Sequence, residues 1–280
     1  MNIKILSDST CDLTQELLTK HNITLVPLTV VKNDQSFKDG VDIRPADIFA
    51  HVAAGGALCS TSAGSVGEYA DMFEKYSAES DAVIHISLGS GFSSSYQNAC
   101  LAAEDFDNVY CVDSMNLSTG QGLVVLQAAA MAESGMEVRA IVDALNALTP
   151  KVEASFLVDK LDYLVKGGRC SSAAALGANL LNLKPCIEVR EGKMSVVKKY
   201  RGNYAKCLAS YAKDRLAGRE DIDRETLFIT RTVVSEDCLH AVSEAVAAQG
   251  DFANIYNTTA GCTISCHCGP GTLGLLFLKK

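Results

Sequence analysis

The sequence has no tryptophan, few other aromatic residues and no excess of positive charge. Aromatic residues make up 6% of the 280 residues, and 25 basic residues stand against 33 acidic ones, for a net charge of −8. Proteins that bind nucleic acids usually present basic patches, and those that bind single strands add aromatic side chains on which bases stack. The composition therefore argues against a nucleic-acid partner.

Long apolar runs are also missing. No segment approaches the roughly 20 apolar residues that a helix needs to cross a bilayer, so we expect no integral membrane segment. The first seven residues lack both a basic region and an extended apolar stretch, so we expect no secretory signal. Without such a signal, the eleven cysteines are expected to be reduced thiols of a cytoplasmic protein.

Hydrophobic residues, at 48% of the chain, are numerous enough to bury a large core, and the length suggests about two domains. Up to about residue 150, short β-like runs alternate with helical patterns, which predicts a mostly parallel sheet flanked by helices. Beyond it, strand pairs joined by turn residues alternate with helices. We therefore expect an α/β protein of two α/β domains, with residues 1–150 forming the first and residues 151–280 forming a second with a mixed sheet.

The expected elements can be given by residue number. Strands are expected at residues 3–6, 24–31, 82–87, 109–112, 155–158, 184–190, 194–198, 226–230, 254–258 and 273–279. Helices are expected at residues 13–20, 66–76, 95–103, 122–133, 204–216 and 238–249. Ser65 and Glu68 have the spacing of a capping box, which predicts a helix start near residue 66.

Hydroxyl side chains gather in three segments of the first half, at residues 7–10, 60–62 and 87–95. In open α/β sheets, ligands usually bind outside the carboxyl ends of the strands. Hydroxyls and free N–H groups at the start of a helix suit an anion. Any one of these Ser or Thr residues is more often a helix cap or a turn residue, but three such segments in one half of the chain favour a shared anion site.

Two residues of the second half add to this hypothesis. Arg169 follows two glycines on a tight turn, although an isolated arginine is usually only a solvated surface residue. His267 lies among cysteine, glycine and proline residues, and we expect its imidazole at the edge of an apolar strand. The other histidines lack such a setting and are expected to be structural or surface residues: His21, His51, His85 and His240.

Two motifs are rejected on their context. Residues 269–274 match GxGxxG, but a strand is expected to follow, whereas a dinucleotide-binding fingerprint opens a helix. Cys262, Cys266, Cys268 and His267 suggest zinc, but alternate residues of the expected strand would point to opposite faces. We therefore expect neither a cofactor nor a metal site.

A serine acyl hydrolase is the enzymatic alternative. Ser93, Asp113 and His267 follow one another in the order of the α/β-hydrolase triad. The residues around Ser93 lack the second glycine of the GxSxG turn, which lets that strained turn approach its neighbours closely. We therefore favour a binding protein that is not an enzyme.

Ordered segments along nearly the whole chain resemble the DegV family of bacterial fatty-acid-binding proteins. The matching segments are residues 7–13, 39–42, 61–65, 92–97, 112–114, 118–120, 161–169, 183–185, 201–202 and 267–274. No single segment is specific, but their order is. Three positions depart from the family pattern. Residues 92–96 read Phe-Ser-Ser-Ser-Tyr instead of Leu-Ser-Gly-Thr-Tyr, residues 61–65 lack a proline, and Cys170 replaces a branched aliphatic residue. The first two departures alter backbone stiffness beside the expected head-group site and leave the preferred acyl chain open.

The resemblance implies that a long-chain fatty acid binds with its carboxylate held by Thr61 and Ser93, and with Arg169 and His267 in support. It also implies that the protein presents the acid to a separate fatty acid kinase, which makes an acyl-phosphate for phospholipid synthesis. Arg201 is the candidate for docking that kinase, and its alternative is an ordinary surface cation.

Burial of the tail is the physical reason for such a carrier. At about 0.8 kcal/mol per methylene, a sixteen-carbon chain gains roughly 11 kcal/mol on leaving water. The aliphatic segments at residues 123–131 and 173–183 are candidates for the wall of a tunnel, and ordinary core packing is their alternative.

Overall fold

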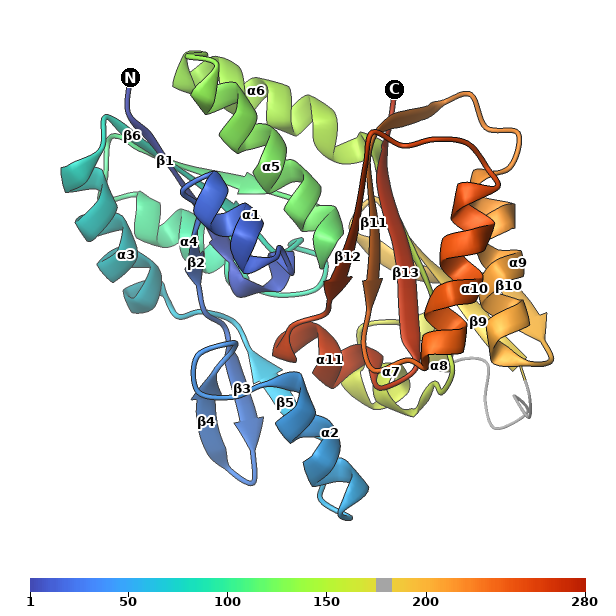
Figure 1. The fold of residues 1–280 in the computed structure, drawn as a ribbon. Coiled ribbons are helices and arrows are strands. Elements are labelled where there is room, and N and C mark those ends of the chain that lie inside the picture. The colour runs from blue at the N-terminus through green and yellow to red at the C-terminus, as the bar shows by residue number, and fades with distance from the viewer. Residues whose placement is uncertain (175–182) are drawn as a thin grey trace.

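The computed structural model describes residues 1–174 and 183–280, which fold around three β-sheets (Figure 1). The strands are β1 Ile3–Asp8, β2 Thr24–Val26, β3 Thr29–Lys32, β4 Gln35–Lys38, β5 Ser60–Ser62, β6 Ala82–Ser87, β7 Val109–Asp113, β8 Val152–Val158, β9 Leu183–Arg190, β10 Lys193–Arg201, β11 Ile222–Arg231, β12 Asn254–Thr259 and β13 Thr272–Lys279. The α-helices are α1 Gln15–Lys20, α2 Pro45–Ala53, α3 Val66–Glu79, α4 Ser95–Ala103, α5 Thr119–Glu133, α6 Val138–Leu148, α7 Asp162–Gly167, α8 Ser171–Ala174, α9 Tyr204–Leu216, α10 Glu236–Ala247 and α11 Cys262–Cys268, with 3-10 turns η1 Ser9–Cys11 and η2 Thr149–Lys151.

The first half is built on a parallel sheet of order β2-β1-β6-β7. Helices α3 and α4 cover one face of this sheet, and α5 and α6 cover the other. Every residue of β6 is buried, as is typical of a strand with helices on both faces. A small antiparallel sheet of order β4-β3-β5 projects below it together with α2 (Figure 1).

The second half is built on a mixed sheet of order β10-β9-β8-β13-β11-β12, in which only β11 and β12 are parallel neighbours. Helices α9 and α10 pack against each other on one side of it. Helix α5 of the first half packs against β8 and β13.

One apolar core is shared by the two halves. The same cluster of buried side chains contains Ile5 and Leu123 from the first half and Phe156 and Phe228 from the second. A buried hydroxyl contact crosses the same boundary, with 2.6 Å between Thr119 Oγ1 and Thr230 Oγ1. The two halves therefore meet through a desolvated interface and not through a flexible linker alone.

The expected α/β class, with a parallel first sheet and a mixed second sheet, is confirmed. All the strands of the two larger sheets fall on the expected sides of residue 150, and the division of the chain into domains at that point stays a proposal. The expected strand at residues 24–31 is wrong as one element, because Pro27 has no N–H to donate and the chain leaves one sheet there to enter another. Helices α2, α6, α7 and α8 and strands β4 and β5 lie outside the expected elements.

The segment that carries His267 is a second correction. It forms helix α11 and not a strand, and β13 starts only at Thr272. Its Gly261 N-cap and its first turn are paired with side chains of the first half, so the sequence around His267 does not itself contain the groups that stabilise the helix.

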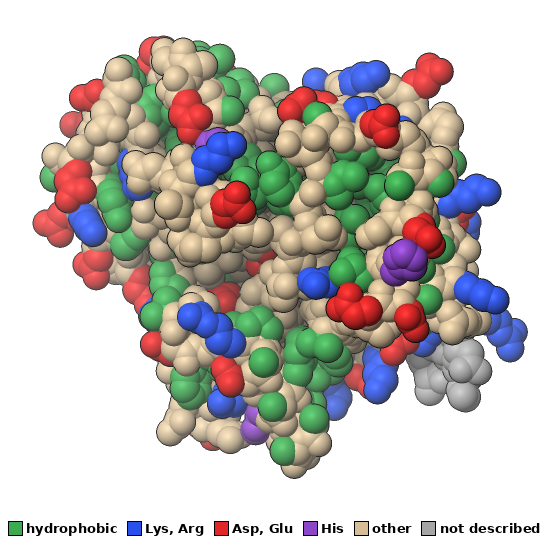
Figure 2. Space-filling model, viewed as in Figure 1, with side chains coloured by type: hydrophobic (Ala, Val, Ile, Leu, Met, Phe, Trp, Pro, Cys, Tyr) green, Lys and Arg blue, Asp and Glu red, His purple; other side chains and the backbone are tan. Residues whose placement is uncertain are grey.

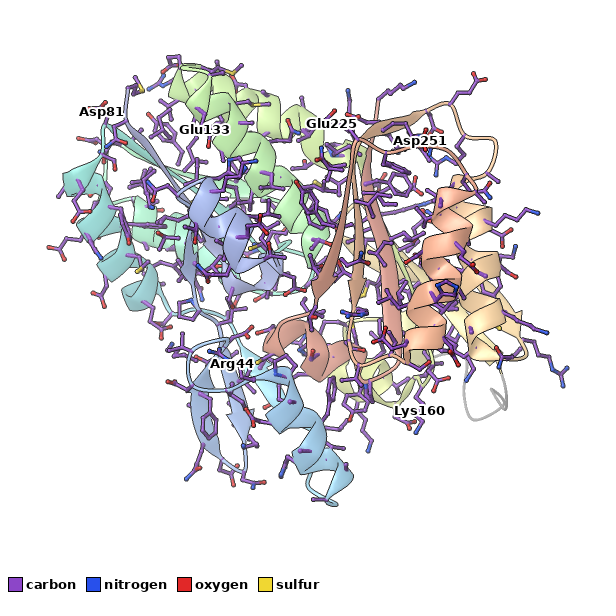
Figure 3. All side chains as sticks on the ribbon, viewed as in Figure 1. Arg44, Asp81, Glu133, Lys160, Glu225 and Asp251 are labelled. Carbon is purple, nitrogen blue, oxygen red and sulfur yellow. The ribbon has the colours of Figure 1, made fainter. Side chains whose placement is uncertain are left out.

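The surface carries interspersed charges. Acidic and basic side chains alternate over the face shown in Figure 2. Arg44, labelled in Figure 3, lies at the start of α2, where its backbone N–H donates to Asp47 over 2.9 Å. No helix in the described part of the chain combines the length and the apolar character needed to cross a membrane.

Candidate functional site

The first turn of α11 is held by two carboxyl groups from the first half of the chain. Asp39 accepts the N–H groups of Cys262 and Thr263 at 2.9 and 3.0 Å. Asp12 accepts the N–H group of Gly261 at 2.8 Å. The first N–H groups of a helix have no partner within it, and its N-terminus carries partial positive charge. The two carboxyl groups therefore satisfy the buried end of α11 and set its position.

Both carboxyl groups are deeply buried. Asp12 is 7% exposed and Asp39 is 4% exposed. Burial raises the pKa of Asp12 to about 8, although hydrogen bonds from Ser118 and Gly261 favour the charged form. At the other end of α11, Gly269 has a φ of +72°, and a Cβ there would lie 2.5 Å from the ring of Tyr163. Glycine is therefore required where the chain leaves the helix.

Helix α11 brings His267 to Thr61, a residue 206 positions earlier in the chain. His267 Nε2 lies 2.7 Å from Thr61 Oγ1. Thr61 is positioned by β5, where it pairs with Val30 in the small sheet. A hydrogen bond thus links the two halves of the chain at the wall of a cavity that both residues line.

Ser93 reaches the same cavity from the turn before α4. Its Oγ lies 2.8 Å from Ser95 Oγ and accepts the N–H group of Ser95 at 3.2 Å. These contacts hold Ser93 in the turn directly before Ser94, the N-cap residue of α4.

Arg169 follows α7, which ends at Gly168 in the left-handed region with a φ of +69°. Its Nη1 donates to the carbonyl of Gly167 at 2.8 Å, and its Nε donates to the carbonyl of Phe92 at 3.5 Å. Within the described ranges, no carboxylate lies at ion-pairing distance from it. The charge of Arg169 is therefore available to an anion at the cavity.

His267 is neutral at physiological pH. Burial, together with the charge of Arg169, lowers its pKa to about 4 from an ordinary 6.5. Its Nδ1 is buried and has no partner among the described residues. A Cβ on Gly167 would lie 2.5 Å from this nitrogen, so the end of α7 packs closely on the imidazole.

The cavity between these residues measures about 50 Å³. Six polar residues line it, the four above together with Ser62 and Thr263. The other walls are apolar: Leu28, Ala63, Leu88, Phe92, Leu117, Leu164, Met194, Ile264 and Cys268. A second cavity of about 30 Å³ adjoins it and shares Leu117, Ile264 and Cys268 with it. The arrangement offers hydroxyls, an imidazole and a cation on the walls of a small, mostly apolar space.

A larger cleft of about 720 Å³ lies elsewhere, beside the turn η2 that follows α6 and lined by residues of β8 and β9 in the second sheet. Its arginines are already paired: Arg215 lies 2.7 Å from Glu188, and Arg219 lies 2.7 Å from Glu153. The arginine charges on its walls are neutralised by these glutamates, so no free charge is left there for an anion among the paired residues. The smaller apolar cavity is therefore the better candidate site.

The hydrolase alternative does not match this geometry. Asp113 accepts hydrogen bonds from Ser90, not from His267, and the imidazole is bonded to Thr61, not to Ser93. Among the described residues, no group of three or more His, Cys, Asp and Glu side chains is arranged to hold a metal ion.

The expected tunnel walls are only partly described. Residues 175–182 of the segment 173–183 lie outside the described residues. The segment 123–131 lies in helix α5 and contributes Leu123, Val124 and Val125 to the main core. None of its residues lines either cavity, and its role as a tunnel wall stays a prediction. The roles of Asp12 and Asp39 are not predicted by any local pattern. The one signal for them is that they lie in two of the segments that resemble the family, residues 7–13 and 39–42.

Comparison with known proteins gives relatives over the full length. A model of the DegV family, described as uncharacterised proteins, matches residues 2–280. A DegV domain-containing protein of Caldanaerobacter subterraneus subsp. tengcongensis is 32% identical over 282 residues and covers 99% of each chain.

Solved structures show the same arrangement. The structure of a DegV family protein from Thermus thermophilus, reported with fatty acid binding, has a TM-score of 0.89 at 30% identity and covers 100% of both chains. A stearic acid-binding protein from Eubacterium ventriosum has a TM-score of 0.85 at 29% identity, with 99% of this chain and 98% of that chain covered. The likeness therefore includes both halves and their relative placement.

Replacing Asp39 by alanine is expected to destabilise the protein. The change leaves the N–H groups of Cys262 and Thr263 buried without an acceptor, at a cost of about 2–4 kcal/mol. Urea unfolding measures this cost. Asp71→Ala, at an exposed position of α3, is the control and should change stability by less than about 0.5 kcal/mol. Equal effects of the two substitutions would contradict the assigned role of Asp39.

The neutral state of His267 predicts a pH dependence of stability in the ligand-free protein. Because its pKa is about 4 in the folded chain and 6.5 ordinarily, the unfolded chain binds the extra proton first as the pH falls. The contribution of His267 to stability is therefore constant above about pH 6.5 and is lost progressively between pH 6.5 and 4. His267→Gln removes this component, so the stability difference between the wild type and the variant should shrink across that window. If the stability difference between the two proteins stays constant from pH 6.5 to 4, the low pKa of His267 is refuted.

Proposed function

Because this chain belongs to the DegV family, we propose that it binds a long-chain fatty acid and holds the carboxylate among Thr61, Ser93, Arg169 and His267. The observation that carries the proposal is the convergence of these four residues, from both halves of the chain, on one cavity whose other walls are mostly apolar. Relatives of the same fold are described as fatty-acid-binding. A fatty acid has a carboxylate and an apolar tail, and the cavity has polar residues and apolar walls that suit the two parts.

A carboxylate is costly to bury unless donors meet it. The hydroxyls of Thr61 and Ser93 are hydrogen-bond donors on short side chains. Arg169 supplies a positive charge that no described carboxylate neutralises. Hydrogen bonds to a charged acceptor are about twice as strong as neutral ones. Together they replace the water that the head group loses on entering the cavity.

His267 is proposed to orient Thr61. With Nδ1 buried and unpartnered among the described residues, the neutral tautomer with its proton on Nε2 avoids burying an N–H group without an acceptor. Nε2–H then donates to Thr61 Oγ1 across the 2.7 Å contact. This leaves the proton of the Thr61 hydroxyl free to donate to the ligand.

The tail is proposed to run between the apolar side chains of the two adjoining cavities. Their volumes, about 50 and 30 Å³, are far below the roughly 300 Å³ or more of a typical ligand pocket. Binding therefore requires wall side chains to move, and Met194 is suited to this because its unbranched side chain adapts to irregular shapes. Tail burial, at about 0.8 kcal/mol per methylene, offsets the cost of opening the space.

Ser93 is proposed to be a donor to the ligand and not a nucleophile. A nucleophilic serine needs a base within hydrogen-bonding reach, and the Ser93 hydroxyl is instead bonded to Ser95. We therefore propose that the protein carries the acid without converting it, and that a separate fatty acid kinase phosphorylates the carboxylate of the presented ligand.

Arg201 is proposed to contact that kinase. It is the last residue of β10, an edge strand of the second sheet, and it is exposed. Gly202 follows with a φ of +121°, so the chain turns sharply there, at the outer end of a long strand.

Native mass spectrometry of the purified protein tests the ligand. We expect an added mass matching a long-chain fatty acid, and the affinity for added acids should rise with tail length by up to about fourfold per methylene. Thr61→Ala and Ser93→Ala should each weaken binding by about 10- to 100-fold, since each removes a hydrogen bond to a charged group. Ser134→Ala, at the exposed end of α5, serves as the control. An affinity that is independent of tail length, or hydrolysis of acyl esters by the protein, would overturn the proposal.

Arg201→Ala is expected to spare fatty-acid binding and to slow kinase-dependent formation of acyl-phosphate by about tenfold or more, because one interfacial cation is lost. Arg139→Ala, which removes an exposed arginine on α6, should leave both activities unchanged. If Arg201→Ala weakens ligand binding as much as it slows phosphorylation, the docking assignment fails while the binding site stands.

A further inference from the structure

Eight buried side-chain nitrogen and oxygen atoms have no hydrogen-bond partner among the described residues. Two of them belong to residues that line the candidate cavity, Oγ1 of Thr263 and Nδ1 of His267. The backbone of Gly167 packs closely on the His267 nitrogen, which leaves no room for a ligand atom there. The hydroxyl of Thr263 is therefore the unpartnered group of the cavity wall that a ligand could satisfy.

Thr263 is the second residue of α11 and is 4% exposed. Its backbone N–H is bonded to Asp39, but its hydroxyl is bonded to nothing in the described part of the chain. A threonine in a helix commonly bonds the carbonyl three or four residues earlier. Those carbonyls here precede the helix, and the carbonyl of Ala260 accepts the hydroxyl of Ser265. A buried hydroxyl without a partner is costly, and a valine of nearly the same shape would avoid the cost.

The position of Thr263 on α11 places it beside the proposed head-group residues. It lies four residues before His267, about 6 Å along the helix axis, so the two side chains share one face. Both line the first cavity, and neither lines the adjoining one. The next two residues on the helix surface, Ile264 and Cys268, line both cavities. Thr263 is therefore close to the head group and not to the far end of the tail.

We propose that Thr263 is a specificity-determining residue that binds a hydroxyl substituent on the first few carbons of the acyl chain. The protein then selects a hydroxylated fatty acid over the unsubstituted acid of the same length. This inference rests on the proposed function, because it takes the carboxylate to be held in the same cavity, and it adds the chemical class of the ligand.

The surroundings of Thr263 favour a neutral substituent. A second carboxylate would lie beside Asp39, whose Oδ2 is 3.0 Å from the Thr263 nitrogen, and like charges repel each other. An amine would share the small cavity with Arg169, with the same result. A ligand hydroxyl can donate or accept, as the Thr263 hydroxyl can. One ligand hydroxyl therefore satisfies the buried group whichever of the two donates.

The Thr263 side chain can meet such a ligand without movement of the helix. Threonine in a helix populates two χ1 rotamers, and rotation between them changes the direction of the hydroxyl. The backbone meanwhile stays fixed, because Asp12 and Asp39 hold the N–H groups of Gly261, Cys262 and Thr263.

Binding of four acids of the same length tests the proposal: palmitic acid, and palmitic acid with a hydroxyl on its third, fifth or last carbon. We expect the wild type to bind the third-carbon or the fifth-carbon hydroxy acid about three- to tenfold more tightly than palmitic acid, as one added hydrogen bond gives. The acid with its hydroxyl on the last carbon should gain nothing, because Thr263 lies near the head group.

Two substitutions assign the preference to the Thr263 hydroxyl. Thr263→Val removes the hydroxyl, keeps the shape, and should abolish the preference without weakening the binding of palmitic acid. Thr263→Ser keeps the hydroxyl and should retain the preference. An equal preference in the wild type and in Thr263→Val, or no preference in the wild type, would overturn this inference and leave the fatty-acid site standing. If palmitic acid itself does not bind, the proposed function and this inference fail together.

Urea unfolding of the ligand-free protein provides a check that needs no ligand. Thr263→Val should raise the urea midpoint, because an unpartnered hydroxyl leaves the interior. Thr119→Val is the matched control, since Thr119 is a buried helical threonine whose Oγ1 lies 2.6 Å from that of Thr230, and it should lower the midpoint. If Thr263→Val lowers the midpoint as much as Thr119→Val does, the Thr263 hydroxyl has a partner within the protein and the inference is overturned.

Discussion

The buried pairing of Asp12 and Asp39 with the first turn of α11 is the contact on which the candidate site depends. A helix of seven residues is too short to be stable in isolation. Its N–H groups must find partners in the interior, and the two carboxyl groups are the acceptors they meet. Because the acceptors belong to the first half and the helix to the second, the same hydrogen bonds that stabilise α11 also fix one half against the other.

The position of His267 follows from that contact. The far end of α11 lies against β5 and α7, so the imidazole meets the Thr61 hydroxyl on one side and the backbone of Gly167 on the other. Burial between these elements keeps the ring neutral. Arg169 therefore supplies the positive charge of the site, while the imidazole and the hydroxyls supply hydrogen bonds of defined direction.

Burial also acts on the thiols around α11. They are held in apolar surroundings that disfavour the thiolate, and burial raises the pKa of Cys262 and of Cys268.

Local pattern was sufficient for most of the fold. Buried strands such as β6 read as continuous apolar runs, and the capping box of Ser65 and Glu68 marks the start of α3. Pattern failed where tertiary contacts outweighed local preference, as in α11, whose stabilising acceptors lie more than 200 residues away. The hydroxyl segments indicated an anion site, and the ordered resemblance named Thr61, Ser93, Arg169 and His267.

The sequence by itself therefore determined the class of the fold, the parallel and mixed sheets, and the four residues that line the candidate site. Only the tertiary structure decided that His267 bonds Thr61 and not Ser93, that Asp113 turns to Ser90, and that α11 is a helix held from the other half. These are pairings between groups far apart in the chain. Their geometry depends on how two sheets and a shared core pack, and no local pattern of residues contains that information.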